Sequence, residues 1–259
     1  MLFYFTVLIH AFSLTGKGGM SHVLNKGVPV NTRMTLLKRI EKIYCPKKSN
    51  IYQIESGDLR TWRYDSDNSV AIELSTKNSS RLNADIDIWR GVDKVPVKMR
   101  VYTENGNLRP FRTVLSTQDE SHNLVIYNTA NFMINTKLKT NPFEMANNNS
   151  YSDSVKMVFS NHIVYTILDG GSVYTSSIPS STELIDILIV TDGYPLNARI
   201  EVQNEDQYDV SQVIELYTEN GNTLPFLCRL MTPNETQIRV VNTVNAHRPM
   251  KVSIMQYDA

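Results

Sequence analysis

The chain has 259 residues, of which 26 are basic and 26 are acidic, so no overall positive field is available to attract nucleic acid. Its two cysteines, Cys45 and Cys228, exclude a disulfide framework and zinc-binding cysteine spacing, and indicate a reducing compartment. The length suits one large domain or two small ones.

The first 19 residues form an apolar leader whose most hydrophobic part is Met1 to Leu14. This part lacks a basic start and is too short to span a bilayer as a helix. Two interpretations follow. The leader is either the signal peptide of a secreted protein or an extension of the gene model, with translation beginning at Met20, and the polar sequence after Met20 favours the second.

A basic amphipathic helix is predicted over residues 32–45, within an N-terminal segment of residues 20–56. Apolar residues recur at helical spacing, and Pro46 ends the pattern. The polar face and the residues just after it carry six basic side chains: Arg33, Lys38, Arg39, Lys42, Lys47 and Lys48. Such a helix can lie on an anionic membrane surface, with Cys45 as a candidate acylation site that would strengthen anchoring. The alternative is that its apolar stripe packs on the first β domain.

A ten-residue stretch occurs twice, first at residues 102–111 and again at residues 217–226, with eight identical positions. Both copies read Tyr-Thr-Glu-Asn-Gly-Asn and end in Pro-Phe. Because Asn-Gly between β-rich runs is a strong hairpin signal, each copy predicts a tight turn between antiparallel strands. Flanking blocks also align, Leu82 to Ile88 with Leu196 to Val202, and Val125 to Thr129 with Arg239 to Thr243. The chain is therefore predicted to contain one domain twice.

The strand pattern predicts an all-β protein: two tandem antiparallel β-sandwich domains, jelly-roll-like, at residues 57–141 and 170–259. Short alternating segments recur about every eight to twelve residues in both, which is typical of sandwiches. In the first repeat they are 61–64, 70–76, 84–89, 97–103, 111–116, 123–127 and 133–138. In the second they are 172–176, 184–191, 198–203, 212–218, 226–231, 236–241 and 250–255. Residues 142–169 are interpreted as a linker, in which 162–168 form an extra strand.

Signatures of catalysis are missing from the sequence. No histidines lie at metal-ligand spacing, and there is no nucleophile elbow, phosphate loop or dinucleotide fingerprint, so no catalytic residue, cofactor or metal is predicted. The repeated Glu104 and Glu219 are expected to face water or bind turn amides, and the repeated Asn-Thr pairs to form Asx turns. Trp89 and Arg90 stand where the second repeat has diverged, and are candidate contacts for a partner or ligand.

The repeated blocks Leu-Asn-Ala, Tyr-Thr-Glu-Asn-Gly, Pro-Phe and Asn-Thr resemble a duplicated β family of algae with red-lineage plastids and of their alveolate relatives. Among apicomplexan parasites, the chain resembles pellicle proteins of the inner membrane complex. Family members carry Trp-x-Gly-Pro after the third strand. The first repeat keeps part of this motif, from Trp89 to Val92, and the second loses it. The resemblance implies a scaffold beneath flattened membrane sacs and supplies no catalytic residues.

Together these features predict a non-enzymatic scaffolding protein on the cytoplasmic face of a membrane-associated cytoskeleton. Its expected partners are proteins and an anionic membrane surface, not nucleic acid, and unpaired strand edges favour association of copies. The alternative is a carbohydrate- or lipid-binding β module, secreted if the leader is a true signal peptide.

Overall fold

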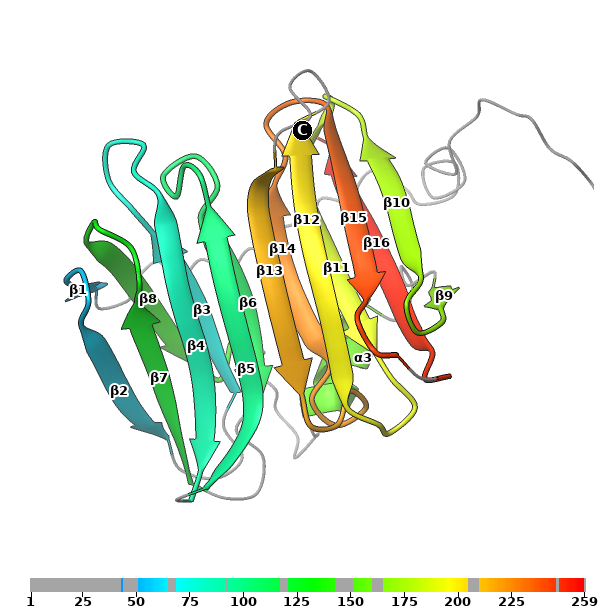
Figure 1. The fold of residues 1–259 in the computed structure, drawn as a ribbon, viewed down its shortest axis with the longest axis horizontal. Helices are drawn as coiled ribbons and strands as arrows, with labels where there is room; N and C mark the ends of the chain where they lie inside the picture. The colour runs from blue at the N-terminus through cyan, green and yellow to red at the C-terminus, as the bar shows by residue number, and fades with distance from the viewer. Residues whose placement is uncertain are drawn as a thin grey trace, which may run out of the picture.

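The computed structural model describes residues 43, 51–64, 69–91, 93–116, 121–142, 151–159, 165–204, 210–245 and 247–258. These residues form two eight-stranded antiparallel sheets that face each other, with one short helix outside them (Figure 1). The prediction of an all-β sandwich is confirmed. The predicted N-terminal helix lies outside the described residues, except for residue 43.

Each half of the chain contributes eight strands. The first half supplies β1 (Ile51–Ile54), β2 (Leu59–Tyr64), β3 (Ser69–Ser75), β4 (Leu82–Arg90), β5 (Lys94–Thr103), β6 (Phe111–Ser116), β7 (His122–Asn128) and β8 (Ile134–Thr140). The second supplies β9 (Thr166–Leu168), β10 (Val173–Ile178), β11 (Thr182–Val190), β12 (Leu196–Asn204), β13 (Val210–Thr218), β14 (Phe226–Met231), β15 (Thr236–Asn242) and β16 (Met250–Asp258).

Both sheets run through both repeats. Sheet A has the order β1-β8-β3-β6-β14-β11-β16-β9, and sheet B has the order β10-β15-β12-β13-β5-β4-β7-β2. Read from the middle outward, the second half of each list repeats the first in equivalent strands. The two repeats are therefore related by a pseudo-two-fold axis and share their sheets, with β1 and β2 at one end of the slab and β9 and β10 at the other (Figure 1).

The repeats join at two strand pairs, β5 with β13 in sheet B and β6 with β14 in sheet A. The registers place Arg100 opposite Glu215 and Thr113 opposite Cys228, which are equivalent positions in the two repeats. Two equivalent backbone bonds close the first pair, from Glu104 N–H to the Ser211 carbonyl at 2.9 Å and from Glu219 N–H to the Pro96 carbonyl at 2.8 Å. The pseudo-two-fold axis therefore passes through the centre of both joins.

One hydrophobic core fills the space between the sheets and continues across the junction. Strands alternate between buried apolar residues and polar residues on the outer face, as in β4, where Ala84, Ile86 and Ile88 are buried. Inward side chains of both repeats belong to one cluster, including Phe111 and Phe226, which are fully buried. Burial of this apolar surface is the main force that holds the two repeats together.

The repeated Asn-Gly stretch forms a turn but not a hairpin, which corrects the sequence-based prediction. The turn connects β5 in sheet B to β6 in sheet A, and its equivalent connects β13 to β14. Asn105 caps a single helical turn: its side-chain oxygen accepts bonds from the N–H groups of Asn107 and Leu108, and its carbonyl from Arg109 N–H. The motif therefore carries the chain between the two sheets.

Helix α3 (Tyr151–Phe159) packs on the outer face of sheet A, within the region predicted to be a linker. The Tyr151 hydroxyl donates to the carbonyls of Val114 at 2.7 Å and Pro225 at 3.3 Å, one from each repeat. Tyr151 and Val155 join a second apolar cluster with Val114, Leu227 and other residues of both repeats, and Ile43 belongs to it too. The linker therefore fastens the junction from outside.

Most predicted strands occur within one or two residues of their expected bounds, and 111–116 and 226–231 match β6 and β14. Strand β1 was missed, and β9 is the described part of the strand expected at 162–168. The Asx turns are confirmed: the Asn128 and Asn242 side-chain oxygens accept from Ala130 N–H and Val244 N–H. Their amide groups also donate to the carbonyls of Ile54 and Leu168, which ties β1 and β9 to the sandwich.

Candidate functional site

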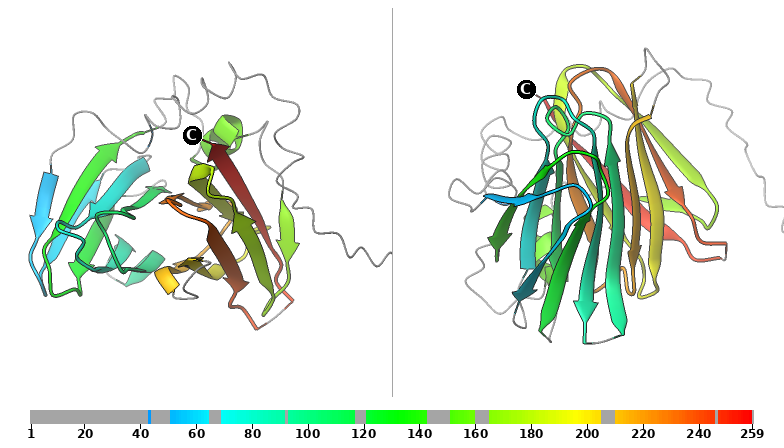
Figure 2. Two further views of the ribbon diagram at one scale, coloured as in Figure 1. Left: turned by 90° about the horizontal axis from the view of Figure 1, so that it is seen from above. Right: turned by 60° about the vertical axis from the view of Figure 1, so that its left-hand side comes forward.

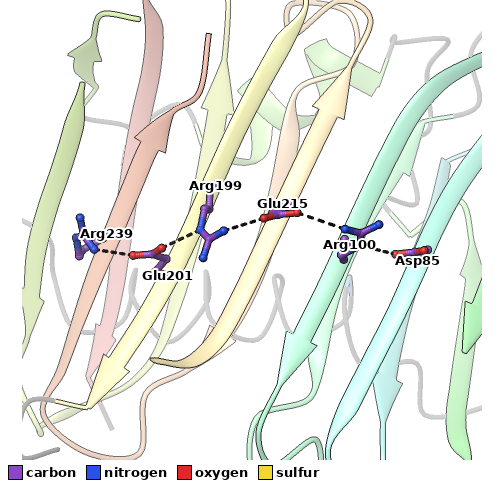
Figure 3. Close-up of polar contacts among 6 residues, drawn as sticks. All are labelled: Asp85, Arg100, Arg199, Glu201, Glu215 and Arg239. Atoms are coloured by element: carbon purple, nitrogen blue, oxygen red, sulfur yellow. Dashed lines mark hydrogen bonds and ion pairs between the residues drawn. The ribbon is translucent and has the colours of Figure 1, made fainter. Parts of the chain in front are cut away.

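The longest chain of linked ion pairs among the described residues is a row of six charged side chains on the outer face of sheet B. Figure 3 shows the row crossing from the second repeat to the first, over β15, β12, β13, β5 and β4. We call it the charged row, and its members are Arg239, Glu201, Arg199, Glu215, Arg100 and Asp85. Each projects outward because its neighbours along the strand point into the core.

Short contacts link each member of the charged row to the next. Glu201 accepts from Arg239 at 2.7 Å and from Arg199 at 2.8 Å. Arg199 also donates to Glu215 at 2.8 Å, and Arg100 donates to Asp85 at 3.1 Å. The Arg100–Glu215 distance of 4.0 Å closes the row at the pseudo-two-fold axis. Side-chain ion pairs of the charged row therefore link the two repeats, in addition to the backbone pairing of β5 with β13.

A shallow groove runs beside the charged row and spans both repeats; it is lined among others by Asp87 and Lys98 of the first and Tyr217 and Thr243 of the second. Burial raises the pKa of Asp87, and the nearby Asp85 adds to this, whereas Lys98 and a hydrogen bond from Trp89 act in the opposite direction. Three arginines and three carboxylates alternate in the row, so its charges cancel. Such a surface suits a polar, electrostatically matched protein surface better than a free anion or cation.

Two further groups of charged side chains, with three ion pairs between them, lie on the strands of sheet A. Arg229 donates two bonds of 2.8 Å to Asp186, and both side chains are almost fully buried. Glu73 accepts from Arg112 at 2.7 Å and Lys137 at 2.6 Å. Burial alone raises the pKa of Glu73, but the bonds from Lys137 and Arg112 outweigh burial and leave this pKa below its usual value. All of these groups are paired with one another.

Of the residues proposed from sequence as partner contacts, the structure describes two. Trp89 is half-buried at the end of β4, and Arg90 forms an ion pair with Glu219 of the other repeat. Arg109, which occurs in one repeat only, donates to Asn204, the counterpart of Arg90. Arg90 thus lies where the repeats meet, and a role of Trp89 and Arg90 in partner contact stays a prediction. Of the repeated glutamates, Glu219 binds Arg90, which the sequence did not predict.

The basic residues Arg33, Lys38, Arg39, Lys42, Lys47 and Lys48, together with Cys45, lie outside the described residues. Ile43 is the one residue of the predicted helix that the structure describes. It is 3% exposed and packs against sheet A, which agrees with the alternative that the apolar stripe of this helix packs on the β-sandwich. The charged row itself was not predicted. The sequence feature that could have indicated it is the placement of charged residues at alternate positions of a strand, as in Asp85 and Asp87 or Arg199 and Glu201, because alternate residues lie on the same face of a sheet.

Within the part of the chain that the structure describes, no three histidine, cysteine or carboxylate side chains gather as metal ligands. The described helix is also too short and too polar to cross a membrane. Burial raises the pKa of the Cys228 thiol, and nearby Asp186 raises it further, so this thiol stays protonated at neutral pH and is a poor nucleophile.

Comparison with solved structures gives only distant likenesses. The exported protein XepA of PBSX is 10% identical, with coverage of 80% of this chain and 87% of that one and a TM-score of 0.24. The oxalate decarboxylase of Lactobacillus farciminis is 8% identical, with coverage of 83% and 79% and a TM-score of 0.22. The vicilin of Solanum melongena is 11% identical, with coverage of 78% and 75% and a TM-score of 0.21. At these scores the likenesses carry no conclusion.

Among curated proteins, none matches the chain. The model of one protein family does match, over residues 46–256, and its description is "Diatom pyrenoid shell protein". This match takes in β1 to β15 and all but the last two residues of β16. It supports the algal part of the resemblance seen in the sequence and gives no support to the apicomplexan pellicle in particular. The chain belongs to the diatom pyrenoid shell protein family.

Proposed function

We propose that this protein is a non-enzymatic structural component that associates with copies of itself to build a protein shell. The observation that carries the proposal is the family match, which spans both repeats. A shell needs a stiff subunit with surfaces on several sides, and the features of the slab agree with that need.

Stiffness comes from the two shared sheets. The sixteen described strands enclose one core, and the repeats are joined by backbone pairing in both sheets, so the described parts of the two halves form one continuous unit. The outer face of sheet B offers the flat charged row, and the ends offer unpaired strand edges. These are surfaces for protein association, and the paired charges described above offer no catalytic arrangement.

The test is assembly of the purified full chain. We expect concentration-dependent, ordered sheets, tubes or closed particles by negative-stain electron microscopy, with matching loss from the supernatant on centrifugation. A chain that stays soluble and unassembled over a wide range of concentration and ionic strength would contradict the proposal.

Localisation separates the shell from the cortical scaffold expected from the sequence. A tagged chain in the cell that expresses it should outline an internal compartment as a closed rim if it forms a shell. A scaffold of the inner membrane complex would instead follow the cell periphery. Attachment to a membrane through the basic N-terminal segment is compatible with either location, and flotation with anionic vesicles tests it separately.

A further inference from the structure

We infer that the end of the slab formed by β9 and β10 binds the same end of a second copy, so that both sheets continue across a two-fold axis. This inference rests on the proposed assembly role and names the surface that one contact uses. We call this end the β9–β10 end; Figure 1 shows it opposite the end formed by β1 and β2.

The β9–β10 end has two unsatisfied strand edges. Among the described strands, β10 pairs only with β15 and β9 only with β16, so each has one side on which backbone N–H and C=O groups lack a strand partner. Natural proteins protect such edges with charges or proline. Neither β10 (Val-Tyr-Thr-Ser-Ser-Ile) nor β9 (Thr-Ile-Leu) contains either. This end is therefore open to pairing with another strand.

Exposed apolar side chains reinforce the conclusion. Ile167 of β9 is 66% exposed and Val173 of β10 is 46% exposed, and Tyr165 just before β9 is also exposed. Large apolar side chains on an unprotected strand edge are typical of an association site.

The opposite end is chemically different although its fold is equivalent. Strand β2, the counterpart of β10, carries Arg60 and Arg63, both exposed, where β10 has Tyr174 and Ser177. A symmetric contact between two β2 strands would bring two arginines from each copy into one interface with no carboxylate on either strand, and charges of this kind protect a strand edge. Charge therefore protects the β2 edge, whereas β1 carries none and Ile51 and Leu59 are each 59% exposed at that end. The β9–β10 end is the one at which both edge strands lack charge, so it is the better suited to symmetric pairing.

The junction inside the chain shows that this geometry is accessible to the fold. There, equivalent strands of the two repeats meet antiparallel about one axis, and both sheets are joined at once. At the β9–β10 end, one short turn connects the two edge strands, with Ser172 N–H donating to the Asp169 carbonyl at 3.1 Å. Counted along the chain, Ile167 in sheet A precedes this turn and Thr175 in sheet B follows it by similar numbers of residues. A single axis can therefore pass close to both.

The pairing that follows can be stated by residue. With the axis at Thr175, this residue lies opposite its own copy, and Val173 lies opposite Ser177 of the second copy, all on the outer face. In sheet A, Ile167 lies opposite its own copy and becomes covered. The contact is isologous and closes on itself, so it gives a dimer with two sixteen-stranded sheets, and further growth of a shell must use other surfaces.

The repeats supply a matched pair of variants. Thr175 on β10 and Thr61 on β2 are equivalent positions, and both are exposed threonines on edge strands. Lysine at position 175 would face lysine across the axis. We expect Thr175→Lys to halve the mass measured by light scattering, from twice 29.5 kDa to 29.5 kDa, at concentrations where the wild type is dimeric. Thr61→Lys should leave the dimer intact.

A crosslink gives a positive result that does not depend on loss of a complex. In a Cys45→Ser background, Thr175→Cys should form a covalent dimer on mild oxidation, because residues opposite each other in paired strands are close enough for a disulfide. Thr61→Cys should not. Equal crosslinking at both positions, equal effects of the two lysines, or a wild-type chain that is monomeric at all concentrations would overturn the inference.

The outcomes also separate this inference from the proposed function. Ordered assemblies that form equally well with Thr175→Lys would leave the shell proposal standing and refute the β9–β10 contact. A specific crosslink at position 175 in a chain that never forms larger assemblies would support the contact and refute the shell proposal.

Discussion

The repeated Asn-Gly pair shows how far the structural role of a single residue, here the glycine, can be predicted from sequence. The sequence predicted a turn at each copy, and the turns are there. The prediction that the two connected strands pair with each other was wrong, because the glycines are required by close packing and not by the left-handed backbone of a hairpin turn. A Cβ atom on Gly106 would lie 2.7 Å from Thr76 Oγ1 and 2.8 Å from Leu82 Cβ, and one on Gly221 would lie 2.6 Å from Thr191 Oγ1. Distances of this kind cannot be derived from a motif.

Replacement of Gly106 therefore tests the close approach. We expect Gly106→Ala to lower the free energy of unfolding by about 1–3 kcal/mol, because the new methyl group overpacks a site walled partly by a Cβ atom. Urea denaturation at neutral pH measures this change. Asn107→Ala, at the exposed next position, should change the stability far less. A loss in Gly106→Ala that is negligible would show that the turn tolerates a methyl group at position 106.

Glu73 makes the stability depend on pH. Its pKa is lowered in the folded protein, so it stabilises the fold above its unfolded value of about 4.5, and this contribution is lost as the pH falls through the still lower folded value. Glu73→Gln should cost about 2 kcal/mol at pH 7. Urea midpoints measured from pH 7 to pH 3 should then decline less steeply in this variant than in the wild type. Glu183→Gln, an exposed carboxylate, is the control and should keep the wild-type slope.

At the scale of elements, strands were more predictable than the helix. Alternation of apolar and polar residues is a local property, so β4, β6 and β12 could be placed from sequence alone. Helix α3 has nine residues and is too short to be stable by itself. Its stability comes from Tyr151 and Val155 packing on sheet A, a surface that exists only after both repeats have joined.

Tyr151 is expected to fix α3 to the junction. Tyr151→Phe keeps the ring and removes the hydroxyl that binds Val114 and Pro225. Loss of this buried hydrogen bond should cost about 1–2 kcal/mol. Hydrogen exchange should accelerate in α3 and at the ends of β6 and β14. The control is Tyr127→Phe, whose side chain is exposed and whose substitution should leave exchange at the junction unchanged.

The basic N-terminal segment gives a prediction about membranes. Glutamine at Arg33, Lys38, Arg39 and Lys42 should abolish most flotation of the full chain with vesicles that contain anionic lipid, since each basic residue near such a surface contributes about 1 kcal/mol. This variant retains Ile43 and its packing on sheet A. The matched control replaces four exposed basic residues of the slab, Arg63, Lys77, Lys94 and Lys98. Equal loss in both variants would show that the segment is not the membrane contact.

At the scale of the whole molecule, the duplication was predicted and the sharing of sheets was not. Sequence alignment of the repeats identifies equivalent strands, but strand alternation does not say which strand lies beside β5. The choice of β13 depends on the pseudo-two-fold axis, at which Arg100 meets Glu215 and Thr113 meets Cys228. The charged row could not be predicted for the same reason, since its continuity across the repeats exists only in the joined sheets. The views in Figure 2 show the two repeats as one continuous slab.

Differences between the repeats at this axis predict that separate halves prefer each other. A homodimer of first halves would oppose Arg100 to Arg100, and one of second halves would oppose Glu215 to Glu215, whereas the native junction brings unlike charges together. Co-expressed halves of residues 43–142 and 151–259 should therefore assemble one to one, as measured by native mass spectrometry. Arg100→Glu should weaken this pairing only several-fold, because the side chain is 66% exposed and such ion pairs contribute about 0.2–1 kcal/mol. The double exchange of Arg100→Glu with Glu215→Arg should restore it. Halves that form homodimers as readily as the mixed pair would show that apolar burial alone joins the repeats and that charge at the axis plays no part in the selection.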